Sequence, residues 1–223
     1  MLTGTSRLHG QYEQMPAGSS RARNDRPETA IYRRRSVQPS RRAVLHVQAS
    51  GDPAAPDDLA GWFTDRAFNF YLAGLRMPGR IATPAATGAA CGDLDSACAY
   101  LRDEDGIGHL IVTAQGRAAL AAAIWSDNRP DGANGLVLCE PDLPPALSLS
   151  ISCPVLVVNA GPANRTTRRP LLGRRQPVAP QLGGHVTWLQ LPAPSDGVAG
   201  RQAFFAELGR WLGAYMYARD QLL

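Results

Sequence analysis

The chain has 223 residues, of which 44% are hydrophobic and 19% are charged, so it has enough apolar side chains for the core of a folded domain. No apolar run approaches the roughly 18 residues that a transmembrane helix needs, and the amino terminus lacks the apolar segment of a secretory signal. The composition excludes a wholly disordered chain and a membrane-spanning protein, and we expect a cytoplasmic protein.

The charge is distributed unevenly, and every basic residue is Arg. Residues 1–42 hold nine Arg against three acidic residues, whereas the remainder holds 14 Arg against 16 acidic residues. A basic arm can bind nucleic acid or an anionic membrane, but here no stacking aromatics alternate with the arginines and no nucleic-acid-binding motif follows. We therefore expect a disordered Arg-rich tail over residues 1–27, a folded domain over residues 28–223, and no nucleic-acid partner.

The first predicted elements of the folded part are strands around one helix. Glu28–Arg35 is predicted to be an edge strand, and Ala43–Val47 a buried strand because it is short and mostly apolar. Asp57 is a residue type that caps helices, so a helix is expected over Leu59–Arg66. Ala67–Leu75 is the next core strand.

The middle of the chain predicts two helices around one strand. Residues 80–92 are rich in Ala, Thr and Gly and are expected to form a loop. Asp93 then begins an amphipathic helix over Leu94–Glu104, followed by a strand at His109–Thr113 and an Ala-rich helix at Gly116–Trp125.

The last part predicts three more strands and a closing helix. Gly135–Cys139, Pro154–Asn159 and His185–Leu191 are expected to be buried strands, and Gln202–Tyr217 a helix. One face of that helix carries its large apolar residues: Phe205, Leu208, Trp211, Leu212 and Tyr215. Apolar strands that alternate with helices indicate an α/β fold, a mainly parallel sheet with helices on both faces.

Cysteine and histidine spacing does not predict a metal site. The four cysteines (Cys91, Cys98, Cys139 and Cys153) form no CxxC pair, and the four histidines stand singly. No glycine-rich phosphate-binding or dinucleotide-binding motif is present either. We expect reduced thiols, no metal and no cofactor.

Several segments resemble, in order, the α/β-hydrolases of the serine aminopeptidase, lysophospholipase and monoacylglycerol-lipase branch. RRAVLHVQASGD stands where that family has its third strand and His-Gly loop, and FNFYLAGLRMPGR is similar to its strand followed by D-L-R-x-x-G-R. Further counterparts are DLDSACAYLRDEDG, HLIVTAQGRAALAAAIW, GLVLCEPDL, CPVLVV, LGGHVTWLQLP and RQAFFAELGRWLGAY. The resemblance covers about residues 28–223 and implies the α/β-hydrolase fold and, by itself, a serine hydrolase.

The family's catalytic residues are missing at the nucleophile and base positions. Its nucleophile motif A-H-S-x-G-G falls on Ala114–Ala119, so Gly116 stands in place of the serine and Arg117 follows it. Its His-Asp motif falls on Ser195 and Asp196, and a serine does not accept a proton near neutral pH as imidazole does. The nearest histidine begins a predicted strand, where we expect a structural role.

The acid, the oxyanion loop and the cap also depart from the family. The acid position falls on Thr167–Arg169, inside an arginine-rich stretch without Asp or Glu, and the His-Gly of the oxyanion loop falls on Gln48 and Ala49. The family's cap, tens of residues long, is reduced here to Pro144–Ser152, so the cap region is largely missing.

We therefore expect a catalytically degenerate α/β-hydrolase relative, with Gly116, Thr167 and Ser195 at the former catalytic positions. Its role would be the binding of a small molecule or a protein, or it would be a decayed protein without one. One alternative is an active esterase, lipase or serine aminopeptidase with an unrecognised site, and another is a lyase or cyclase on the same fold. The candidate binding residues are Arg117, Asp142, Arg169 and Asp196, and the arginines favour an anionic ligand.

Overall fold

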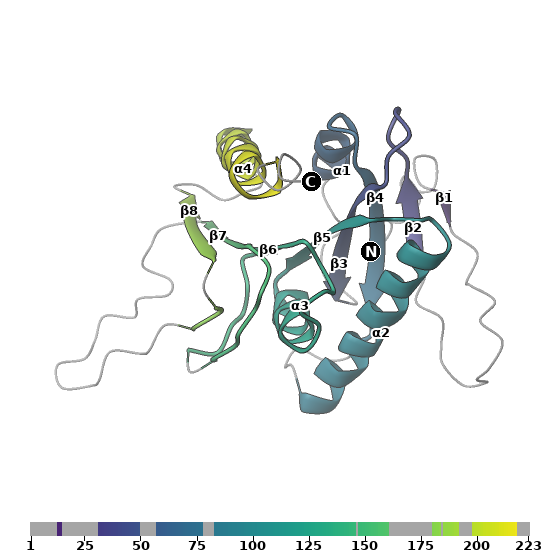
Figure 1. Cartoon of the computed structure of the whole chain (residues 1–223). Coiled ribbons are helices and arrows are strands. Elements are labelled where there is room, and N and C mark those ends of the chain that lie inside the picture. Colours follow the sequence, from purple (N-terminus) through teal and green to yellow (C-terminus); the bar gives the residue numbers. More distant parts are fainter. Residues whose placement is uncertain are drawn as a thin grey trace, which may run out of the picture. The chain divides into compact units, whose positions relative to one another are not determined.

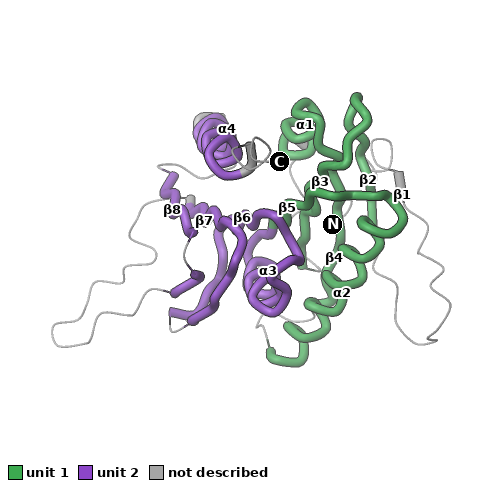
Figure 2. The backbone as a smooth tube through the Cα atoms, in the orientation of Figure 1, with its two compact units in different colours: residues 1–113 green, residues 114–223 purple. Residues whose placement is uncertain are grey.

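The structure is a computed structural model that describes residues 13–14, 31–49, 57–77, 83–145, 147–160, 180–183, 185–191 and 198–217. The chain divides into two compact units, residues 1–113 and residues 114–223 (Figure 2). The folded part that we expected as one domain over residues 28–223 falls into these two units. Within the expected tail only Glu13–Gln14 is described, and these two residues form a short strand that pairs with Ile31–Arg34.

The first unit is built on a sheet whose strand order is β1-β2-β4-β3-β5. Its strands are β1 (Glu13–Gln14), β2 (Ile31–Arg34), β3 (Arg42–Ala49), β4 (Asn69–Leu75) and β5 (His109–Gln115), of which β5 extends two residues into the second unit. Strands β3 and β4 are parallel, whereas β1 and β2 are antiparallel additions at one side. Most of β3 and β4 is buried, as expected for strands with apolar residues on both faces.

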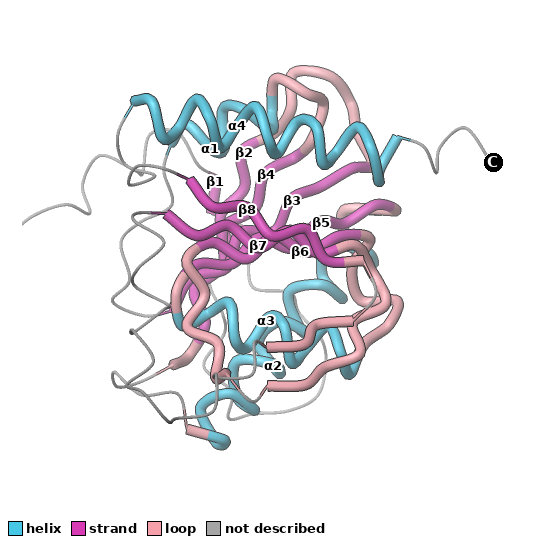
Figure 3. Tube along the Cα trace, turned by 90° about the vertical axis from the view of Figure 1, so that its left-hand side faces the viewer, coloured by secondary structure: helices cyan, strands magenta, loops and turns pink. Residues whose placement is uncertain are grey.

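Two helices of the first unit, α1 (Asp57–Thr64) and α2 (Pro84–Asp103), lie on opposite faces of its strands (Figures 1 and 3). Helix α2 corrects the sequence prediction, because it begins within the stretch that we expected to be a loop over residues 80–92. The Thr83 side chain accepts a hydrogen bond from the Ala86 N–H at 3.2 Å, and Pro84 occupies the first turn, where its missing N–H has no cost. Asp93, expected to begin the helix, lies in its middle.

The second unit continues the parallel pattern with β6 (Gly135–Cys139), β7 (Val155–Ala160) and β8 (Val186–Leu191). Helices α3 (Arg117–Asn128) and α4 (Val198–Leu212) cover opposite faces of this unit, and a π-helical turn over Gly213–Tyr217 follows α4 (Figure 3). Each unit is therefore α/β with helices on both faces, as the sequence predicts.

The connection from β6 to β7 is short, as we expected for a missing cap. It runs from Glu140 to Pro154, and its described residues, 140–145 and 147–154, contain no helix. Within the described part of the chain, no helix combines the length and the apolar character that crossing a membrane requires.

Candidate functional site

The candidate site begins at Gly116, which joins strand β5 to helix α3. Its backbone has φ 56° and ψ −121°, in a region where a side chain is strained and glycine is favoured. The Gly116 N–H donates to the Cys139 carbonyl oxygen at 3.0 Å, which fixes the turn against the end of β6. A sharp, strained strand-to-helix turn of this kind is where α/β-hydrolases carry their nucleophile.

The segment after β6 lies beside this turn. Glu140 has a positive φ of 46°, and its N–H donates to the Val158 carbonyl oxygen at 2.7 Å. The Asp142 N–H then approaches the Gly116 carbonyl oxygen at 3.4 Å. The structure thus brings together three residues singled out in the sequence, Gly116, Arg117 and Asp142, at the carboxyl ends of β5 and β6, the edge at which α/β folds bind ligands.

Cys139 is the nearest thiol to the turn, and it is poorly suited to attack a substrate. Burial, together with a smaller effect from the neighbouring charge of Glu140, raises the pKa of its thiol to about 12. Because the thiolate is the nucleophilic form, almost all of this thiol is protonated and unreactive at neutral pH.

The expected oxyanion-loop residues lie in the first unit, at the carboxyl end of β3. Gln48 is paired with Gly74 of β4 and Ala49 with Leu75. Ala49 is buried, and the side-chain oxygen of Gln48 is buried without a hydrogen-bond partner. They belong to a different compact unit from Gly116.

The remaining predicted positions fall outside the described residues. These are the acid position at Thr167, the base position at Ser195, and the candidate binding residues Arg169 and Asp196. The sequence assignments for these four residues stay predictions.

Two histidines, His46 and His185, have positions that suit structural roles, and His185 is the one for which the sequence predicts such a role. His46 is buried in β3, where its Nδ1 lies 2.8 Å from the Thr113 Oγ1 and its ring stacks on Phe70. Burial lowers the pKa of His46 to about 4, so the ring is neutral at pH 7. His185 is exposed before β8, and its carbonyl oxygen accepts from the Val155 N–H at 2.8 Å. Within the described ranges, no group of three His, Cys, Asp or Glu residues is placed to hold a metal ion.

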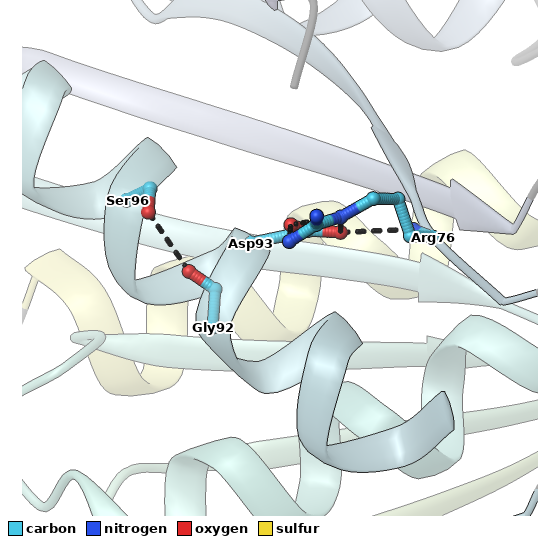
Figure 4. A network of polar contacts seen from close by, with 4 residues as sticks. All are labelled: Arg76, Gly92, Asp93 and Ser96. Atoms are coloured by element: carbon cyan, nitrogen blue, oxygen red, sulfur yellow. Dashed lines mark hydrogen bonds and ion pairs between the residues drawn. The ribbon is translucent and has the colours of Figure 1, made fainter. Parts of the chain in front are cut away.

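An ion pair of the first unit, between the partly exposed Arg76 and the buried Asp93, explains the arginine in the segment that resembles D-L-R-x-x-G-R. Arg76 directly follows β4, and its Nε and terminal nitrogen donate to the Asp93 carboxylate at 2.8 Å and 2.5 Å (Figure 4). The Arg76 backbone N–H donates to the same carboxylate at 2.9 Å. Asp93 is only 2% exposed, so this contact holds the chain after β4 against α2. The sequence prediction missed the pair because it placed Asp93 at a helix start.

Sequence comparisons do not identify relatives: no family model matches the chain, and no curated protein matches it. Solved structures do match. Esterase 2 of Thermogutta terrifontis with butyrate bound has a TM-score of 0.62 at 12% identity, over 93% of this chain and 95% of that chain. Alpha/beta hydrolase domain-containing protein 10 from mouse has a TM-score of 0.60 at 9% identity, over 91% of this chain and 98% of that chain.

A carboxylesterase from Mesorhizobium loti has a TM-score of 0.58 at 17% identity, over 81% of this chain and 94% of that chain. At identities this low, the likeness establishes the fold and leaves the activity open. It agrees with the family resemblance of the sequence and with the turn at Gly116. The chain has the α/β-hydrolase fold.

Proposed function

We propose that this chain is an α/β-hydrolase relative that does not catalyse hydrolysis and acts by binding. The observation that carries the proposal is Gly116: the strand-to-helix turn keeps a conformation typical of a nucleophile position, but the residue on it has no side chain. Formation of an acyl-enzyme requires an oxygen or sulfur atom at this position. Removal of catalytic-triad members costs about 10⁴- to 10⁶-fold in rate in serine proteases.

Other features around the turn support the same conclusion. The thiol of Cys139 is held in its protonated form, and the Asp142 side chain is exposed to solvent. In the sequence, Ser195 stands at the base position and Thr167 at the acid position, so neither supplies the proton acceptor or the orienting carboxylate of a triad. The short β6–β7 connection leaves little chain to enclose an acyl group.

The sequence motifs suggest that the ancestor belonged to the serine aminopeptidase, lysophospholipase and monoacylglycerol-lipase branch. For the retained role we propose an anionic ligand, a carboxylate or a phosphate, because Arg117 directly follows the turn and Arg169 is its candidate companion. Asp142 and Asp196 are the candidate polar residues of the same site.

The activity test compares the unmodified chain, Gly116→Ser, and Gly116→Ser combined with Ser195→His. We expect the unmodified chain to hydrolyse p-nitrophenyl esters, lysophospholipid and aminoacyl-naphthylamides no faster than buffer alone does. A fluorophosphonate probe should leave it unlabelled, in contrast to the Thermogutta esterase 2, which is phosphorylated by paraoxon. Gly116→Ser alone should stay inactive, because a serine without a general base is a weak nucleophile.

Turnover by the unmodified chain that a covalent serine or cysteine inhibitor abolishes would refute the proposal and support an active hydrolase. Turnover gained by the double variant over Gly116→Ser would support Ser195 as the former base position. For binding, phosphate or a short carboxylate should raise the melting temperature of the unmodified chain, and Arg117→Gln should remove that increase.

A further inference from the structure

Strand β8 ends the strand order of the second unit, with β7 on one side (Figure 1). Its residues are far more exposed than those of β7. Trp188 is 50% exposed, whereas Val157, its paired residue on β7, is fully buried. Among the described residues, no strand pairs with β8 on its other side.

The hydrogen bonds between β7 and β8 show which backbone groups of β8 point away from β7. The Val155 N–H donates to the His185 carbonyl oxygen at 2.8 Å, and Val155 is paired with Val186. In a parallel pair, alternate residues of a strand direct both backbone groups to the same neighbour. The groups of Thr187 are therefore directed to β7, and those of Val186 and Trp188 are directed away from it. No described residue forms a hydrogen bond with these outward groups.

The residue types of β8 leave this edge open to further pairing. The strand reads VTWLQL, without a charged residue or a proline, and its pairing with β7 runs without interruption from Val186 to Leu191. Proteins commonly protect an edge strand with charged side chains, proline or a bulge. Strand β8 has none of these, and its Val, Thr and Trp residues favour extended structure. It is therefore suited to accept a further strand.

We propose that a second copy of this chain pairs with this edge, so that two β8 strands lie antiparallel about a two-fold axis at Thr187. In this register, Val186 and Trp188 of one copy exchange backbone hydrogen bonds with Trp188 and Val186 of the other. The side chains match as well. On one face each Trp188 ring packs against Val186 of the other copy, and on the other face the two Thr187 side chains meet, and both pairings stabilise sheets.

A second copy fits this edge better than a segment of different chemistry. Because β8 is uncharged, two copies meet without repulsion, whereas a charged peptide would find no opposite charge on the strand. The same residues serve on both sides of the contact, which is the condition for a closed dimer with a two-fold axis. This inference is independent of the proposed function, since none of its residues belongs to the turn at Gly116.

The first test is sedimentation velocity of the full chain over a range of concentrations. We expect a reversible equilibrium between monomer and dimer. Trp188→Thr keeps a residue type that suits a strand but removes the ring, and it should weaken dimerisation on the order of tenfold or more. The matched control, Tyr215→Ser, removes another exposed aromatic side chain, outside β8, and should leave dimerisation unchanged. Melting temperatures establish that both variants are folded.

Hydrogen exchange resolved by residue tests the same contact without any substitution, and it decides the result if Trp188→Thr impairs folding. The N–H groups of Val186 and Trp188 should exchange slowly at high chain concentration and rapidly at low concentration. The N–H of Thr187, which is directed to β7, should exchange slowly at both concentrations.

Three results would overturn the proposal. One is a chain that stays monomeric at every concentration. Another is a dimer in which the Trp188 N–H exchanges as fast as it does in the monomer, because that dimer would use a different surface. The third is an equal loss of dimerisation in Trp188→Thr and Tyr215→Ser, which would show no particular role for β8.

Discussion

At the residue scale, the proposed function rests on Gly116, through its backbone conformation and its lack of a side chain together. A positive φ at a strand-to-helix turn is a strained position for most residues, and glycine occupies it without strain. The same turn in an active hydrolase accepts that strain in order to expose a serine hydroxyl. In this chain the residue at the turn is a glycine, which has no side-chain oxygen or sulfur atom.

Asp93 is a second residue whose role depends on its surroundings. Its carboxylate is buried in the middle of α2 and receives three hydrogen-bond donors from Arg76. Asp93→Asn should lower the free energy of unfolding by about 1–3 kcal/mol, because it removes the negative charge that accepts these three hydrogen bonds. The loss is limited because the side chain of Arg76 is partly exposed and stays in contact with water. Urea denaturation measures the loss. Asp103→Asn, at the exposed end of the same helix, is the control and should change stability by less than about 0.5 kcal/mol.

His46 predicts a dependence of stability on pH. Burial lowers the pKa of its ring from 6.5 to about 4 in the folded chain, so the unfolded chain binds the proton more readily. The contribution of His46 to the free energy of unfolding should therefore be largest above pH 6.5. It should fall by on the order of 3 kcal/mol as the pH drops toward 4.

Urea denaturation between pH 4 and pH 7 tests this for the unmodified chain and for His46→Gln. The variant loses packing at every pH, so the informative quantity is the difference between the two pH curves. The unmodified chain should be more stable than His46→Gln at pH 7, and this difference in the free energy of unfolding should become smaller as the pH falls. Parallel curves would show that His46 keeps an ordinary pKa in the folded chain.

At the scale of elements, most strands and helices follow from local patterns, and the errors have identifiable causes. Strands β3, β6 and β7 are short apolar runs and lie within two residues of their predicted ends. Helix α2 begins earlier than predicted, because Thr83 and Pro84 start a helix that its Gly and Thr residues do not suggest. Helix α4 begins at Val198 and ends in a π-helical turn, so Tyr215 leaves the predicted apolar face and is 38% exposed.

The packing of α4 gives a matched pair of mutations. Trp211 is 3% exposed on this helix, and its ring centre lies 6.2 Å from that of Tyr215. Trp211→Ala should lower the free energy of unfolding by about 3–5 kcal/mol, because it leaves a large cavity. Tyr215→Ala, at the exposed position, should cost less than about 1 kcal/mol. Chemical denaturation measures both, and similar losses would mean that α4 does not pack through Trp211.

At the scale of the whole molecule, the chain matches solved α/β-hydrolase structures over most of its length, while its sequence identity to them is 9–17%. The alternation of apolar strands and amphipathic helices is therefore preserved where individual residues are not, because a parallel sheet constrains polarity and size rather than identity. The β6–β7 connection is short, and its described residues, 140–145 and 147–154, contain no helix.

The sequence by itself determined the α/β class and the order of the strands along the chain, because these depend on local periodicity and residue type. Only the tertiary structure decided the positive φ of Glu140, the approach of Asp142 to Gly116, and the pairing of Arg76 with Asp93. These features depend on contacts between residues distant along the chain, whose geometry is set by how strands and helices pack and leaves no periodic signal in the sequence.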